Sequence, residues 1–204
     1  MKGCLSFIIK TIIAVLVFFG LLHLGVIDFI KEKIEEYRGN EEVRQEKMVD
    51  KTKDIVDLSE IEEEYSIEKN LKLLGNRMVI ADHKSTNQKM IMLEPKNENI
   101  LTKEDVESDI IQQKIENALQ KYKHQPIKFE EIKVIKKGEM QGLGQKVPYA
   151  KVSASISNIP MMKDVEGIVG VAELENGKNL IVISVNEKGK YSQIIADGFY
   201  SKVK

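Results

Sequence analysis

The sequence predicts an α+β fold: an antiparallel sheet of five or six strands packed with helices, preceded by a single transmembrane helix. Three observations lead to this expectation. A run of mostly apolar residues lies near the start, at 11–30. Short apolar runs separated by turn residues fill much of the remaining chain, as in a sheet built from hairpins. Between these runs, residues 102–122 place apolar side chains at helical spacing.

Residues 11–30, TIIAVLVFFGLLHLGVIDFI, can cross a bilayer, since about 20 helical residues match a hydrocarbon core about 30 Å thick. The main alternative is a cleaved signal peptide with Lys2 and Lys10 as its basic head. However, the segment lacks a small-x-small cleavage site, and its apolar run is longer than a typical signal core. The sequence therefore predicts an uncleaved signal anchor within residues 1–38 and a single-pass membrane protein.

The side of the membrane that holds the rest of the chain is less sharply indicated. Lys31, Lys33 and Arg38 follow the anchor, while Lys2 and Lys10 precede it, so the positive-inside rule does not favour export. A short head before one apolar helix is nevertheless the usual layout of an exported, tethered domain. On that layout we expect the soluble domain on the non-cytoplasmic side.

Composition excludes several classes of function. A net charge of −1, with 31% charged residues of mixed sign, is typical of a solvated surface and not of a nucleic-acid binder. The single cysteine, Cys4, excludes an internal disulfide and a cysteine-based metal cluster. The glycines of Met140–Gln145 fit neither a P-loop nor a dinucleotide motif. We therefore predict no cofactor, no metal and no catalytic residue.

Residues 39–58 are rich in charge and poor in apolar side chains. This composition predicts a linker or a weak helix ahead of a soluble α+β domain at 59–204. Ser59 and Glu62 have the spacing of a capping box, so we expect a helix to begin there.

The remainder of the domain is predicted to combine strands with two further helices. Thr102 and Asp105 mark the start of a long helix that ends near residue 122. A change of apolar parity between Phe129 and Ile132 indicates a bulge. Asn176-Gly177 predicts a tight hairpin, because both residues tolerate positive φ. We expect strands at 78–81, 90–93, 127–135, 150–156, 167–174 and 180–185, and a last helix at 190–203 that presents Tyr191, Ile194, Ile195, Phe199 and Val203 to the sheet.

The C-terminal half runs from PYAKVSASIS to the predicted hairpin GIVGVAELENGKNLIVISV, and on to a helix that ends in IIADGFYSKV. With NRMVIADH and KMIMLEP as a first hairpin, this order resembles the PsbP-like superfamily of α/β/α sandwich domains over residues 75–204. The aromatic, proline-rich opening strand common in that superfamily is missing. The resemblance implies an accessory or binding protein, and it carries over no catalytic or metal-binding residue.

His83 and His124 are the side chains that a dispersed active site would use. No serine or cysteine with the context of a nucleophile accompanies them in the sequence, and a surface histidine is the commoner situation. Pro160-Met161-Met162 lies between two predicted strands and is a candidate apolar contact for a protein partner, with core packing as the alternative.

We therefore expect a membrane-tethered accessory or interaction domain without catalysis, whose protein partner the sequence does not identify. One alternative is a structural subunit of a membrane assembly, in which His23, Gly20 and Gly25 of the anchor make contacts. The other is an enzyme whose site is dispersed along the chain.

Overall fold

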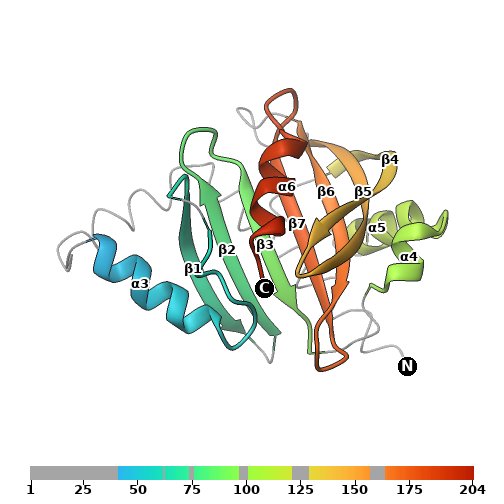
Figure 1. The fold of residues 1–204 in the computed structure, drawn as a ribbon. Helices are drawn as coiled ribbons and strands as arrows, with labels where there is room; N and C mark the ends of the chain where they lie inside the picture. Colours follow the sequence, from blue (N-terminus) through green and yellow to red (C-terminus); the bar gives the residue numbers. More distant parts are fainter. Residues whose placement is uncertain (1–40, 62, 74–75, 97–100, 121–128, 157–163) are drawn as a thin grey trace.

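The computed structural model describes residues 41–61, 63–73, 76–96, 101–120, 129–156 and 164–204 (Figure 1). These residues form one antiparallel sheet packed with helices, which confirms the predicted α+β class. No helix in this part of the chain is both long and apolar enough to span a bilayer. The predicted anchor at 11–30 lies outside the described residues.

The described sheet has seven strands, one more than the upper number predicted, and neighbouring strands are antiparallel. Their order across the sheet is β1-β2-β3-β7-β6-β5-β4. Strands that follow each other in the chain are therefore neighbours, except where the chain passes from β3 near the centre to β4 at the edge. The bounds are Tyr65–Leu73 (β1), Asn76–His83 (β2), Lys89–Glu94 (β3), Phe129–Gly142 (β4), Gln145–Ile156 (β5), Val165–Glu173 (β6) and Asn179–Glu187 (β7).

Strand β1 occupies the place of the helix that was predicted to begin at Ser59, so that prediction is wrong. Tyr65 and Ile67 are buried and pair with β2. A register shift between Ile67 and Lys69 interrupts the strand. The apolar residues of this segment also match helical spacing, and the acids before Tyr65 resemble a solvated helical face. Pairing with β2 decides the outcome, because tertiary contacts override weak local preferences.

The hairpin predictions are confirmed in their positions. β2 and β3 pair as expected, and the turn before β7 contains Gly177 with φ 76°. The turn from β4 to β5 has positive φ at both Leu143 (52°) and Gly144 (68°), which suits a two-residue hairpin loop. The predicted bulge appears as a register shift between Phe129 and Glu131, and β4 continues to Gly142, well beyond its predicted end.

The long helix predicted at 102–122 is broken in two, α4 (Lys103–Glu107) and α5 (Ile110–Gln120). The predicted capping box is present: the Thr102 hydroxyl accepts from the Asp105 amide, and the Asp105 carboxylate accepts from the Thr102 amide. The break follows at Ser108, whose backbone is extended and whose hydroxyl donates to the carbonyl of Asp105. Such side-chain bonds to the backbone compete with helix continuation.

The last helix, α6 (Gln193–Ser201), is shorter than predicted. Phe199 and Val203 face the sheet as expected, but Ile194 is 83% exposed, so its predicted core position is wrong. The buried positions of α6 are instead Ala196, Phe199 and Tyr200. The predicted helix face did not include Tyr200.

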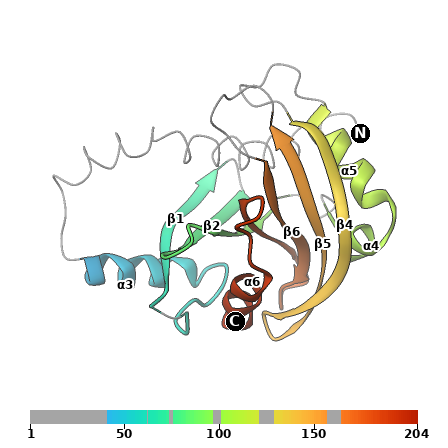
Figure 2. The same cartoon turned by 90° about the horizontal axis from the view of Figure 1, so that it is seen from above.

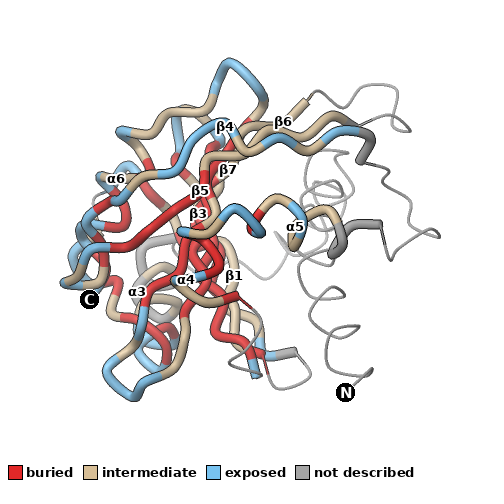
Figure 3. Tube along the Cα trace, turned by 90° about the vertical axis from the view of Figure 1, so that its right-hand side faces the viewer, coloured by how far each residue is buried: buried red, intermediate tan, exposed pale blue. Residues whose placement is uncertain are grey.

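Helices cover the two faces of the sheet differently (Figures 1 and 2). One face, which we call the α6 face, packs against α6 and residues 55–58. The other, the α4–α5 face, packs against α4 and α5. Buried residues concentrate in the central strands, and exposed ones at the turns (Figure 3). The fully buried large side chains are Leu58, Ile67, Ile80, Met90, Ile91, Met92, Leu93, Ile111, Ile168, Phe199 and Tyr200.

Within the segment predicted as a linker or a weak helix, Glu41–Thr52 forms helix α3 alongside β1. The side chain of Gln45 accepts from the Ile67 amide at 2.9 Å and donates to the Ile67 carbonyl at 3.3 Å. It therefore satisfies backbone groups on an edge strand that would otherwise be open to pairing. Further along, Ile55, Val56 and Leu58 are buried in the core of the α6 face. The folded body thus includes most of this segment.

Candidate functional site

Polar side chains gather at opposite ends of the sheet. We call one the His83 end and define it by residues 63–65, 83–88 and 187–195. We call the other the Glu94 end and define it by residues 76–77, 94–96 and 174–178. Hydrogen bonds among uncharged polar groups dominate the His83 end, whereas ion pairs dominate the Glu94 end. The two ends also connect different elements of the fold.

His83 is the last residue of β2 and is only 7% exposed. Its Nδ1 lies 2.9 Å from Thr86 Oγ1 and 3.3 Å from Ser85 Oγ. Its Nε2 lies 3.8 Å from a carboxylate oxygen of Glu64, and its ring packs edge-on against Tyr65 with centroids 5.1 Å apart. The predicted candidate therefore has both hydroxyls and a carboxylate within reach, but all of them come from adjoining turns and the imidazole is nearly enclosed.

A buried glutamine extends this cluster toward α6. Gln88 Nε2 donates to Ser184 Oγ at 2.9 Å and to the Ser192 carbonyl at 2.8 Å, while its Oε1 accepts from the Ser192 amide at 2.8 Å. Asn186 Nδ2 donates to the Thr86 carbonyl at 3.1 Å. Because each buried polar group has partners, these bonds fix the β2–β3 turn to the residues that precede α6.

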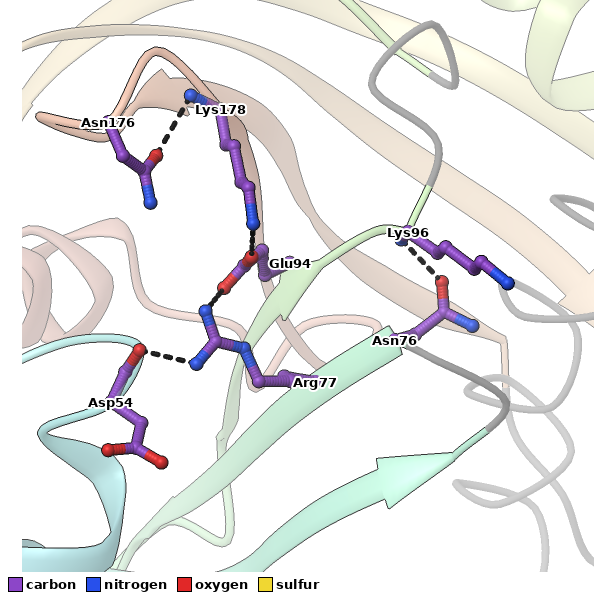
Figure 4. Close-up of polar contacts among 7 residues, drawn as sticks. All are labelled: Asp54, Asn76, Arg77, Glu94, Lys96, Asn176 and Lys178. Carbon is purple, nitrogen blue, oxygen red and sulfur yellow. Dashed lines mark hydrogen bonds and ion pairs between the residues drawn. The ribbon is translucent and has the colours of Figure 1, made fainter.

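The Glu94 end holds a charged cluster around one carboxylate (Figure 4). The Glu94 side chain is 5% exposed and forms ion pairs with Arg77 and, at 2.9 Å, with Lys178. Arg77 also donates to the Asp54 carbonyl at 2.6 Å. This arrangement ties β2, β3, the β6–β7 turn and the segment after α3 together. The two cations neutralise the charge of the buried Glu94 carboxylate. The cluster is therefore suited to a structural role, in which it holds these elements together.

Two further partly buried ion-pair groups lie close to the His83 end. Lys89 Nζ is 2.9 Å from Glu68 Oε1 and 3.0 Å from Asp82 Oδ2. On the α6 face, Lys151 pairs with Glu166, and its Nζ lies 5.2 Å from the centroid of the Tyr191 ring. Burial, followed by nearby negative charge, raises the pKa of Tyr191, which keeps its hydroxyl neutral at physiological pH.

The described residues include no group of three His, Cys, Asp or Glu side chains that could hold a metal ion. His124 and Pro160-Met161-Met162, which the sequence marked as candidates, lie outside the described residues, as does Cys4. Sequence reasoning had named His83 but not Gln88 or Glu94. A glutamine after a turn and a glutamate at a strand end are ordinary residues, and their partners lie far away in the chain.

The chain matches no protein-family model, and no curated protein is significantly similar to it in sequence. The resemblance to the PsbP-like superfamily stays a prediction.

Proposed function

We propose that this protein is a membrane-tethered accessory or interaction domain that binds a protein partner without catalysis. Residues 11–30 form the anchor, and the folded domain lies on the non-cytoplasmic side. The observation that carries the proposal is the apolar run itself, which precedes a compact folded body by only ten residues. Those ten residues, 31–40, span at most about 35 Å when fully extended. The domain is therefore held close to the bilayer.

The interior contacts of the domain support a binding role. His83 and Glu94, the two most enclosed ionisable side chains at the ends of the sheet, are engaged by neighbours within the fold. An α/β/α sandwich of the PsbP-like type, proposed here for residues 75–204, would likewise act as an accessory module. Fold alone does not determine function, so the partner has to be found by experiment.

Protease accessibility tests the tether and its direction. Intact cells, permeabilised cells and isolated membranes that carry the full chain are treated with protease, and residues 41–204 are detected by an antibody. We expect the domain to stay with the membrane after alkaline extraction and to be cleaved when only the outer side is accessible. A variant that lacks residues 11–30 is the control and should be released. Alkaline release of the full chain would contradict the anchor.

Chemical crosslinking in the same membranes tests the binding role. A specific crosslinked protein that is recovered with the full chain, and lost with the variant lacking 11–30, would support the proposal. If the anchor itself makes the assembly contacts, Gly20→Leu with Gly25→Leu should disrupt the assembly while the domain still folds. An assembly that survives both changes would contradict this second role of the anchor.

One observation favours a second candidate, an enzyme that uses His83. Its imidazole lies between Ser85 Oγ and the Glu64 carboxylate, at 3.3 and 3.8 Å. A histidine beside a hydroxyl can act as its base. Incubation of the purified chain with small ester substrates tests this candidate, with Ser85→Ala as the matched variant. Turnover that disappears in Ser85→Ala would favour the enzyme and would count against a purely binding role.

A further inference from the structure

We propose that the His83 end of the domain lies against the lipid headgroups, with Ile194 as the side chain that enters the interface, while the Glu94 end points away from the membrane. This inference rests on the proposed anchor and names the surface that the tether presents to the bilayer. It follows from the direction of α3 and from an exposed apolar residue.

The direction of α3 follows from two contacts of the helix and one just after its end, taken in chain order. Gln45 bonds to Ile67, which lies near the start of β1. The Lys51 carbonyl accepts from Asn70 Nδ2 at 2.6 Å, and the Asp54 carbonyl accepts from Arg77. The helix therefore runs from the His83 end toward the Glu94 end beside β1.

The tether consequently joins the domain on the side of the His83 end. Its pattern of Ile30, Ile34 and Tyr37 predicts a helical continuation of the anchor. Ten helical residues rise only about 15 Å, whereas a nine-residue strand such as β1 is about 30 Å long. With that helical continuation, the distance between the bilayer and α3 is about half the length of the sheet, which favours the nearer end as the one that meets the headgroups.

Ile194 supplies the independent observation. It is the most exposed of the large apolar side chains in the described part of the chain, at 83%, and it lies in the first turn of α6. The neighbouring residue is held in place, because Tyr65 Oη donates to the Ile195 carbonyl at 3.0 Å. An exposed apolar side chain that is held in a fixed position among polar residues can insert at the boundary between headgroups and acyl chains.

The exposed lysines of this end suit the same contact. Lys84, Lys188 and Lys190 are exposed on the two turns beside Ile194. Lys188 lies 3.7 Å from Asp164, and Lys190 lies 2.8 Å from Glu187. The Lys188–Asp164 pair is exposed on both sides and is therefore weak, so the Lys188 ammonium group can turn toward lipid phosphates. Lys190, by contrast, pairs with the mostly buried Glu187 carboxylate. Glu63 and Glu64 are also exposed here, so the contact depends on shape and on Ile194 more than on net charge.

Site-specific fluorescence quenching tests the orientation. Cys4→Ser removes the natural thiol from the full chain, and single cysteines are then introduced as Ile194→Cys, Lys84→Cys or, at the Glu94 end, Glu175→Cys. Each is labelled with a polarity-sensitive dye and reconstituted in phosphatidylcholine–phosphatidylglycerol vesicles that carry a spin-labelled lipid. We expect several-fold stronger quenching at positions 194 and 84 than at 175. Equal or stronger quenching at 175 would overturn the orientation.

Flotation of the same vesicles distinguishes a failure of the proposed anchor from a failure of the proposed orientation. A full chain that does not float with lipid would overturn the anchor and this orientation together, whereas a floating chain quenched mainly at 175 would overturn the orientation alone. Ile194→Asp in the Lys84→Cys background should still float and melt normally, but with several-fold weaker quenching. Unchanged quenching in that variant would overturn the role of Ile194.

Discussion

The α6 face of the sheet is covered by one helix of nine residues and the α4–α5 face by helices of five and eleven residues, and the side chains of these helices are buried to different degrees. On the α6 face, Phe199 and Tyr200 are completely buried. On the α4–α5 face, Ile111 is buried, but Ile115 and Val152 are only partly so. Among the side chains that the structure describes, α6 therefore buries two large aromatic rings, whereas α5 buries a single isoleucine.

The aromatic side chains of α6 account for the difference. The rings of Phe199 and Tyr200 meet edge-on with centroids 5.2 Å apart, and Phe199 also contacts Tyr65 of β1. The Tyr200 hydroxyl lies 2.7 Å from the Ile183 carbonyl and 3.2 Å from that of Ile91. Large rings bury more surface per residue than aliphatic chains do, and a polar tip can anchor them to the central strands. The depth of burial therefore depends on the size and shape of the side chains of a helix, and not only on their periodicity.

The largest effect should come from Phe199→Ala, which leaves a cavity between α6 and β1. We expect a loss of about 3–5 kcal/mol in the free energy of unfolding, measured by urea denaturation. A loss below that of the Ile115→Ala variant would contradict the difference between the two faces.

Ile115→Ala is the matched change on the α4–α5 face. Because Ile115 is only partly buried, we expect a loss of about 1–2 kcal/mol in the same denaturation experiment. A cost as large as that of Phe199→Ala would show that the two faces are equally sealed, and the comparison would fail.

Tyr200→Phe keeps the ring and removes the hydroxyl, so it separates the aromatic packing from its polar anchor. We expect a cost of about 1 kcal/mol at neutral pH. Burial also raises the pKa of Tyr200 well above the ordinary value of 10.0. Folding therefore favours the neutral hydroxyl, and its contribution is lost as pH rises above that value. The variant should lack this alkaline loss, and identical profiles would contradict the assignment.

Asp105→Asn tests the first turn of the other face and should have the smallest effect, about 0.5–1 kcal/mol. Burial alone would raise the pKa of Asp105, but the Lys114 side chain and the Thr102 amide outweigh it and hold the pKa below 3.8. Stability from this carboxylate is therefore present above pH 3.8 and is lost as pH falls through the lower folded value. Thermal melts of the two proteins should converge in acid. A constant difference would argue against the ionised form.

Much of the fold was predictable where local chemistry decides the structure. The turn at Asn176-Gly177 and the cap at Thr102 and Asp105 depend on residues a few positions apart. The identity of β1 was not predictable in this way, because its strand character depends on pairing with β2. The break at Ser108 was equally hidden, since serine is tolerated within helices and its hydroxyl bond is visible only in the structure.

The candidate site was less accessible to sequence reasoning than the fold. His83 could be named because histidine is rare and chemically versatile, but its enclosure by Thr86 and Tyr65 could not. Gln88 and Ser192 are separated by more than a hundred positions in the chain, and no local pattern links them. Clusters of this kind are created by the topology, which brings the β2–β3 turn beside the start of α6.

The packing of α3 against β1 has a kinetic consequence for any partner. The folded body already begins at Glu41, so the proposed tether is short. The domain therefore stays within a thin layer of solution next to the membrane surface. A binding partner anchored next to it in the same membrane would meet it at an effective concentration on the order of millimolar. Weak, rapidly reversible contacts would then suffice for stable association, and the domain could exchange partners without leaving the membrane.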